Sequence, residues 1–129
     1  MIVVDASAVI EVLLNSRAAA RIVQRLFAAG ETLHAPHLLD LEVLQVLRRY
    51  AAAGTLSVER ADQALEDLAD LPLERYPHSP FLNRIWQLRH NLTAYHAAYV
   101  VLAEALAAPL VTRDRAIARA THRARVEVL

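Results

Sequence analysis

The chain has 129 residues, of which 56% are hydrophobic, and its 14 basic residues balance its 14 acidic residues. This length and composition predict one folded domain, residues 1–129, and the balanced charge gives no global attraction to nucleic acid or to an anionic membrane. The sequence has no cysteine and no lysine, which excludes disulfide scaffolds, thiolate zinc sites, Schiff-base catalysis and lysine-dependent phosphate loops. It also shows no targeting leader and no membrane-spanning run, so we expect a soluble cytoplasmic protein.

The first third of the chain predicts a strand, two helices and a second strand. The opening β-branched run suits a strand buried on both faces of a parallel sheet, and this strand ends at Asp5. Gly30 is expected to cap the second helix at its C-terminal end. The four elements are Met1–Val4, Ala6–Asn15, Ala18–Ala29 and Thr32–Ala35.

Two helices are predicted in the middle of the chain. The first, His37–Ala53, is closed by Gly54 and carries an apolar stripe at spacings of three and four, with Glu42 off the stripe. The second follows the N-cap Ser57 and runs to about Asp70. The residues predicted to face the core are Leu38, Leu41, Leu44, Leu47 and Ala51 in the first helix and Leu65 and Leu68 in the second.

Strands and helices continue to alternate in the last part of the chain. Thr93 is the expected N-cap of its helix, and Pro109 forces that helix to stop. The elements are strands Leu73–Tyr76, Leu110–Thr112 and Val126–Leu129, and helices Pro80–His90, Thr93–Ala107 and Asp114–Thr121. The alternation predicts an α/β fold, a three-layer α/β/α sandwich with a central, mostly parallel sheet, in which ligands gather at the carboxyl ends of strands.

Three acidic residues are predicted to converge at that end of the sheet. Asp5 closes the first strand, Glu42 lies one turn into the helix after the second strand, and Asp114 follows the strand that ends at Thr112. Hard divalent cations such as Mg²⁺ take oxygen ligands of this kind, and such ions activate water and stabilise the leaving oxygen of a phosphodiester. The acids therefore support a phosphodiesterase hypothesis.

Four segments resemble, in order, the PIN-domain ribonucleases and specifically the VapC-type toxins of type II toxin–antitoxin systems. They are VVDASAVIEVL at Val3–Leu13, LLDLEVLQVLRR at Leu38–Arg49, LTAYHAAYVVLAEAL at Leu92–Leu106 and PLVTRD at Pro109–Asp114. The resemblance covers essentially the whole chain and implies a single PIN domain with the PIN-like sandwich fold. It also implies endoribonuclease activity on tRNA or rRNA that depends on Mg²⁺, with Mn²⁺ as an alternative ion.

The resemblance assigns the catalytic acidic positions to Asp5, Glu42, residue 96 and Asp114. Asp5, Glu42 and Asp114 are the implied metal ligands. The hydroxyls of Ser7 and Thr112 are expected to orient ligands or water nearby. Contacts to the RNA backbone are expected from Arg113, Arg115 and Arg119, although a solvated charged face explains these arginines equally well.

Residue 96 departs from the family pattern, because this chain has His96 where its relatives have aspartate. Imidazole is a neutral, softer ligand that suits Mn²⁺ or Zn²⁺ better than Mg²⁺, so the expected activity is weakened. An alternative function is therefore a catalytically inactive binding module that still dimerises and binds its antitoxin. In either case the resemblance implies a VapB-type antitoxin and a homodimer, with RNA as the substrate of the active form.

Each candidate acid also has a structural explanation. Asp5 and Asp114 could cap the helices that follow them, and Glu42 could be a solvated helix residue; the metal-site interpretation is favoured by the resemblance. A phosphatase or phospho-receiver on a similar sheet is disfavoured, because it would need a lysine that the chain lacks.

Several other polar and aromatic residues receive no functional role. Trp86 and Leu88 are predicted to be core residues, while Tyr95 and Tyr99 could be core or pocket wall. The histidines predicted to be surface or loop residues are His34, His37, His78, His90 and His122.

Overall fold

The computed structural model describes all 129 residues and is built around a five-stranded sheet in the order β3-β2-β1-β4-β5. All four strand pairings are parallel, so the predicted sheet is confirmed and is parallel throughout. The strands are β1 (Ile2–Val4), β2 (Leu33–Pro36), β3 (Leu73–Tyr76), β4 (Leu110–Thr112) and β5 (Val126–Val128).

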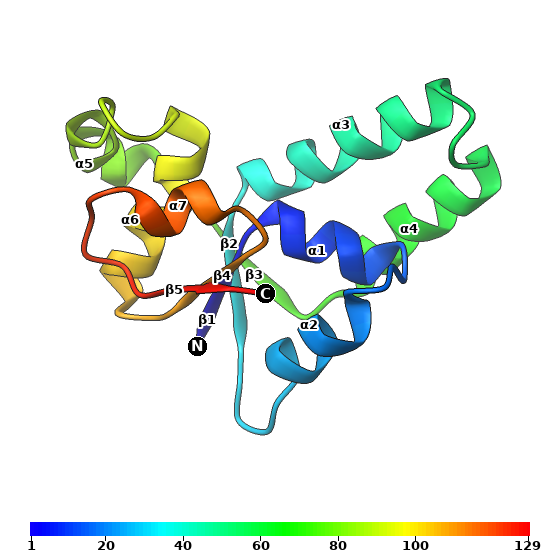
Figure 1. Ribbon diagram of the computed structural model, residues 1–129, viewed down its shortest axis with the longest axis horizontal. Helices are drawn as coiled ribbons and strands as arrows, with labels where there is room; N and C mark the ends of the chain where they lie inside the picture. Colours follow the sequence, from blue (N-terminus) through cyan, green and yellow to red (C-terminus); the bar gives the residue numbers. More distant parts are fainter.

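Helices cover both faces of this sheet, which confirms the α/β/α sandwich. Figure 1 shows α1 to α4 on one side and α5 to α7 on the other. Their bounds are α1 (Ala6–Leu13), α2 (Ala19–Leu26), α3 (Leu38–Ala52), α4 (Val58–Asp70), the short 3-10 turn η1 (Ser79–Phe81), α5 (Leu82–Gln87), α6 (Ala94–Leu106) and α7 (Arg115–Arg119). None of the helices is long and apolar enough to span a membrane.

The strand order reverses direction between β1 and β4. The chain steps outward from β1 to β2 and β3 through α1 to α4, then returns past β1 to β4 through α5 and α6 on the opposite face. Right-handed crossovers place helices on opposite faces when the direction of travel changes. The carboxyl ends of β1 and β4 therefore flank the crevice where ligands bind in open α/β sheets.

The core lies on both sides of β1. Ile2, Val3 and Val4 are fully buried, as expected for a central strand with an uninterrupted apolar run. Every residue of α6 from Ala97 to Ala103 is also buried, because this helix packs against β1, β2 and β4. A single cluster of 29 buried residues joins the two layers.

The predicted inward face of α3 is only partly correct, because Leu47 is buried as predicted but Leu41 and Leu44 are not. Leu39, Val43 and Leu47 are buried, whereas Leu41 is 70% exposed and Leu44 is also exposed. The helix carries leucine or valine on two faces at helical spacing, so periodicity alone could not select the buried one. In α4, likewise, Leu68 faces inward as predicted, but Leu65 is exposed.

Trp86 is also not a core residue, in contrast to the prediction. It is 66% exposed, with the guanidinium of Arg89 lying 4.6 Å from its ring centroid, while Leu88 is buried as expected. The predicted helix Pro80–His90 is shorter and divides into η1 and α5, because Pro80 lies in a separate 3-10 turn.

His34 is buried in the middle of β2, so the prediction of a surface or loop residue is wrong. Its Nε2 lies 2.8 Å from Thr32 Oγ1, and its Nδ1 lies 2.7 Å from Tyr76 Oη. The predicted helix Ala18–Ala29 ends earlier, at Leu26, and Gly30 adopts its positive φ of 82° in the following loop rather than at the helix cap.

Candidate active site

Asp5 is the buried centre of the candidate site. It follows β1 and is only 4% exposed. Its Oδ2 accepts hydrogen bonds from Ser7 Oγ at 2.7 Å and from Thr112 Oγ1 at 2.8 Å. Although Asp5 occupies the N-cap position of α1, its side chain makes no capping hydrogen bond. Two hydroxyls therefore orient the carboxylate into the crevice between β1 and β4.

Glu42 lies opposite, near the start of α3, where the hydroxyl of Tyr99 donates to its Oε1 at 2.5 Å. Burial raises the pKa of Glu42, and repulsion from Asp5 adds to this rise, while the Tyr99 hydrogen bond and the proximity of His96 oppose it. Burial also raises the pKa of Tyr99, so its proton stays on the phenol. Tyr99 thus fixes the position of a half-buried carboxylate.

Asp114 has a structural role as well as a place in the site. Its Oδ1 accepts a hydrogen bond from the backbone N–H of Ala116 at 2.9 Å, which caps α7. Its own backbone N–H donates to Thr112 Oγ1 at 3.0 Å, linking Asp114 to the hydroxyl that holds Asp5. The capping interpretation is therefore correct for Asp114, but it leaves Oδ2 facing the crevice.

His96 occupies that side of the crevice. It lies in the first turn of α6, where its backbone N–H donates to Oγ1 of the N-cap Thr93 at 3.2 Å. Its Nε2 lies 3.4 Å from Asp114 Oδ2. His96 thus contacts Asp114 directly, and its proximity lowers the pKa of Glu42.

Residues 2–123 of the chain match the profile of the PIN domain. The chain belongs to the PIN-domain family. Its curated relatives include Ribonuclease VapC1 of Mycobacterium tuberculosis, 46% identical over 92% of this chain and 89% of the relative, and Ribonuclease VapC12 of the same species, 38% identical over 100% and 99%. These similarities confirm the predicted VapC-type membership.

Solved structures show the same fold at low sequence identity. PAE2754 from Pyrobaculum aerophilum superposes with a TM-score of 0.73 at 24% identity, covering 97% of this chain and 87% of that one. VapBC2 from Rickettsia felis, bound to a DNA fragment from their promoter, gives a TM-score of 0.72 at 15% identity, covering 98% of each chain. The α/β architecture of this PIN domain is thus shared with both.

The donor atoms of this PIN domain suit a hard divalent cation that keeps part of its water shell. No three histidine, aspartate or glutamate side chains lie close enough together to form a complete ligand cage. The second carboxylate oxygens of Asp5 and Glu42 nevertheless accept no hydrogen bond from the protein. Because Mg²⁺ commonly binds through one or two carboxylates together with water and phosphate, these two free oxygens fit such an ion.

The three predicted RNA-contacting arginines of the PIN domain lie on the segment after β4. Arg113 donates from Nη1 to the carbonyl of Leu129 and from its backbone N–H to Ser7 Oγ at 3.0 Å. Arg115 and Arg119 are exposed on α7 and form no ion pair. Arg115 and Arg119 therefore have unpaired guanidinium groups in solvent, whereas the guanidinium of Arg113 is held by Leu129 and lies 3.9 Å from Glu11.

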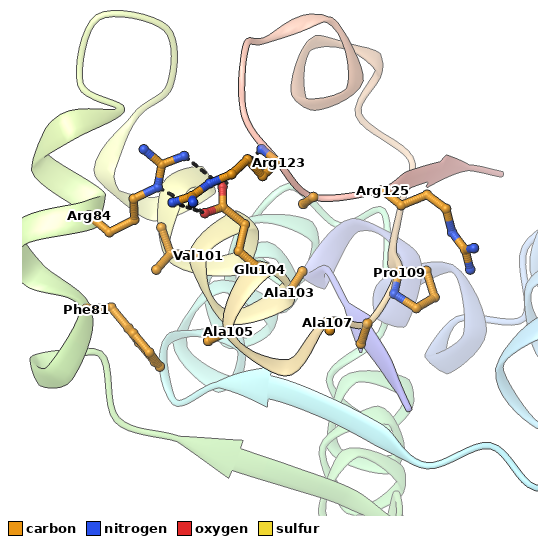
Figure 2. Close-up of a pocket in the computed structure, with 12 residues that line it drawn as sticks. Phe81, Arg84, Val101, Ala103, Glu104, Ala105, Ala107, Pro109, Arg123 and Arg125 are labelled. Atoms are coloured by element: carbon orange, nitrogen blue, oxygen red, sulfur yellow. Dashed lines mark hydrogen bonds and ion pairs between the residues drawn. The ribbon is translucent and has the colours of Figure 1, made fainter.

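One cavity of the PIN domain lies away from the candidate acids of the site. It has a volume of about 580 Å³ and surrounds the C-terminal end of α6, whereas His96 is at the other end of that helix. Figure 2 shows Arg84 and Arg123 converging on Glu104 over a floor of small apolar residues. Arg84 forms a two-pronged hydrogen bond with Glu104, and Arg123 and Arg125 each lie within 4 Å of an acid, so every arginine of this cavity has a partner in the protein.

The sequence alone left the role of Tyr99 open. Its phenol ring is fully buried while its hydroxyl reaches Glu42, so this residue serves both the core and the site. The sequence feature that could have indicated this role is the spacing of three residues between His96 and Tyr99, which places both on one side of α6.

Proposed function

We propose that this PIN domain is the toxin of a VapBC-type pair and that it hydrolyses phosphodiester bonds in RNA, in tRNA or rRNA, with Mg²⁺ or Mn²⁺ bound between Asp5 and Glu42. The relatives named Ribonuclease VapC, at 38% and 46% identity over nearly the whole chain, support the activity. We further propose that it acts in the cytoplasm as a homodimer and is held inactive by a VapB-type antitoxin.

The observation that carries this proposal is the pairing of two oriented carboxylates at the reversal of strand order. Asp5 is held by Ser7 and Thr112, and Glu42 is held by Tyr99, so each keeps one oxygen free in the same crevice. A bound divalent ion there would supply an activated water and neutralise charge on the scissile phosphate. The protein's own part is to fix these acids before substrate arrives, so that no reorganisation is needed during the reaction.

His96 is proposed to weaken this site. It takes the position of an aspartate in the family pattern, and its imidazole lies beside Asp114 Oδ2, while Ala116 occupies Oδ1. Asp114 therefore has neither oxygen free for an ion. An aspartate at position 96 would repel Asp114 instead, and two carboxylates so close favour binding a cation between them.

The second candidate function is an inactive binding module that folds, dimerises and engages its antitoxin. The contact between His96 and Asp114 favours it, because His96 takes the place of one acid and its imidazole lies against an oxygen of another. Cleavage distinguishes the two functions, whereas antitoxin binding does not.

The test compares the chain with His96→Asp on tRNA and rRNA fragments, with Mg²⁺, Mn²⁺ or a chelator. His96→Asp/Asp5→Asn serves as the inactive control, and far-UV circular dichroism verifies that each protein is folded. We expect at least tenfold faster cleavage by His96→Asp, abolished by the chelator and by the control substitution. If no variant cuts any RNA while all bind antitoxin, the ribonuclease proposal is wrong and the binding module is the function.

A further inference from the structure

A second cavity, of about 400 Å³, opens beside the acidic site and differs from it in charge. Its walls come from the end of α1, the connection to α2, α2 itself and the segment after β4. The lining residues are Glu11, Ser16, Arg17, Ala18, Arg21 and Arg113. Three of these six side chains are guanidinium groups, so the cavity is predominantly basic.

Two of the arginines have no partner in the protein. Arg17 and Arg21 are exposed and form neither an ion pair nor a side-chain hydrogen bond. The single acid, Glu11, already accepts a hydrogen bond from Ser16, and its other oxygen lies 3.9 Å from Arg113 Nε. The lining therefore carries an excess of two positive charges that nothing in the chain neutralises.

The start of α2 adds to this positive potential. Its N-cap is Ala18, which has no side chain able to accept a hydrogen bond, and no acid lies in the first turn. The first N–H groups of a helix carry partial positive charge and attract anions when no side chain caps them. The unpaired arginines and the uncapped helix end thus favour the same kind of ligand, an anion.

The basic cavity is connected to the acidic site through Arg113. The backbone N–H of Arg113 donates to Ser7 Oγ, and that hydroxyl donates to Asp5. On the other wall, Glu11 follows Asp5 by six residues along α1, a separation of about 9 Å at the rise of an α-helix. A nucleic-acid strand with one phosphate at Asp5 would therefore bring a neighbouring phosphate to the cavity.

We propose that Arg17, Arg21 and Arg113 form a subsite for a phosphodiester flanking the scissile one in a single RNA strand. The planar guanidinium fork matches phosphate oxygens in pairs, and the subsite positions the strand without reading its bases. This inference rests on the proposed ribonuclease function, because RNA is its ligand. It assigns a binding role to Arg17 and Arg21, which lie far in sequence from Glu42 and Asp114.

The test measures binding of a fluorescein-labelled single-stranded oligoribonucleotide by fluorescence anisotropy in excess chelator, where no cleavage occurs. Arg17→Gln/Arg21→Gln is compared with Arg48→Gln/Arg49→Gln, a pair of likewise exposed and unpaired arginines on α3 that removes the same charge. We expect the first pair to raise the dissociation constant roughly tenfold. The slope of log affinity against log salt should fall by about 0.7 for each phosphate that the variant no longer neutralises, and the control pair should leave both quantities near the wild-type values.

The outcomes separate this inference from the proposed function. Loss of RNA affinity confined to Arg17→Gln/Arg21→Gln supports the subsite even if no variant cleaves RNA. Equal loss in both pairs, or no loss in either, overturns it even if His96→Asp is an active nuclease. Unchanged RNA binding with weakened antitoxin binding would also overturn it, since the cavity would then be a contact for the protein partner.

Discussion

Among individual residues, Tyr99 connects the core most directly to the acidic site. Its side chain is fully buried, and its hydroxyl is the only donor that the protein offers to Glu42. A half-buried carboxylate without such a donor is poorly solvated, and its pKa would rise further. The orientation and charge of Glu42 therefore depend on a residue of a different layer of the sandwich.

Replacing Tyr99 by phenylalanine should destabilise the protein by about 1–2 kcal/mol, because it removes a hydrogen bond to a partly buried charged group. Urea unfolding followed by far-UV circular dichroism measures this loss. Tyr95→Phe is the matched control, since Tyr95 is 65% exposed and makes no hydrogen bond through its hydroxyl. Its effect should stay within about 0.5 kcal/mol; equal losses in the two variants would show that the Glu42 contact contributes nothing.

His34 gives the fold a pH dependence that is separate from the acids. It is 5% exposed, and burial lowers its pKa below the ordinary value of 6.5, although Glu74 at 3.6 Å partly opposes this. The folded protein therefore prefers neutral His34. Its contribution to stability is present above pH 6.5 and is lost as the pH falls from 6.5 through the folded pKa, because only the unfolded chain readily takes the proton.

Wild-type protein should accordingly lose stability as the pH falls below 6.5, at up to about 1.4 kcal/mol per pH unit from this residue. His34→Gln should flatten that part of the profile, whatever its effect on absolute stability. Thermal unfolding across this pH range provides the measurement, with His78→Gln as a control at an exposed position. Parallel profiles for wild type and His34→Gln would contradict the assignment.

Among the elements, α3 has one buried and one exposed face that both carry leucine, and substitutions on the two faces should differ in their effect on stability. Leu39 is fully buried and Leu41 is 70% exposed, only two residues away on the same helix. Leu39→Ala should cost about 2–5 kcal/mol through lost burial and a residual cavity, while Leu41→Ala should cost less than about 0.5 kcal/mol. Urea unfolding distinguishes the two variants. A larger loss of stability for Leu41→Ala would show that the helix face predicted from the leucine spacing is the buried one.

The order of strands and helices could be predicted because each boundary has a local chemical signal. Ser57 and Thr93 accept the capping hydrogen bonds expected of them, and Pro109 separates α6 from β4. The inward face of α3 could not be predicted, because it depends on which neighbours pack against the helix. Trp86 shows the same limit: its size suggests a core residue, but α5 is short and lies at the edge of its layer.

Only part of the acidic site could be predicted from the sequence itself. Asp5 directly follows β1 and Asp114 follows β4 by two residues, so the topology alone brings them to one edge of the sheet. Glu42 was expected there from its place one turn into the helix after β2, whereas residue 96 was assigned to the site by the family resemblance alone. The proposed binding role of Arg17 and Arg21 could not be predicted from the sequence, because it depends on Arg113, which is distant in sequence but lines the same cavity.

For the whole molecule, the joined core predicts a single unfolding transition. One cluster of 29 buried residues includes side chains from both helical layers and from every strand next to β1. Far-UV circular dichroism and the near-UV signal of the buried tyrosine should therefore change together in urea. Trp86 fluorescence should change little, because its ring is already largely in water. Two separate transitions would instead indicate two independently folding units.

The parallel pairing of β1 with β4 also determines when activity can arise. Asp5 is synthesised before its partner Thr112, which lies 107 residues later, and Asp114 follows Thr112. A chain still emerging from the ribosome therefore holds Asp5 without the hydroxyl and the acid that complete its surroundings. For a protein proposed to cut RNA, this order of synthesis means that Asp5 is held in its site only after Thr112 has been made.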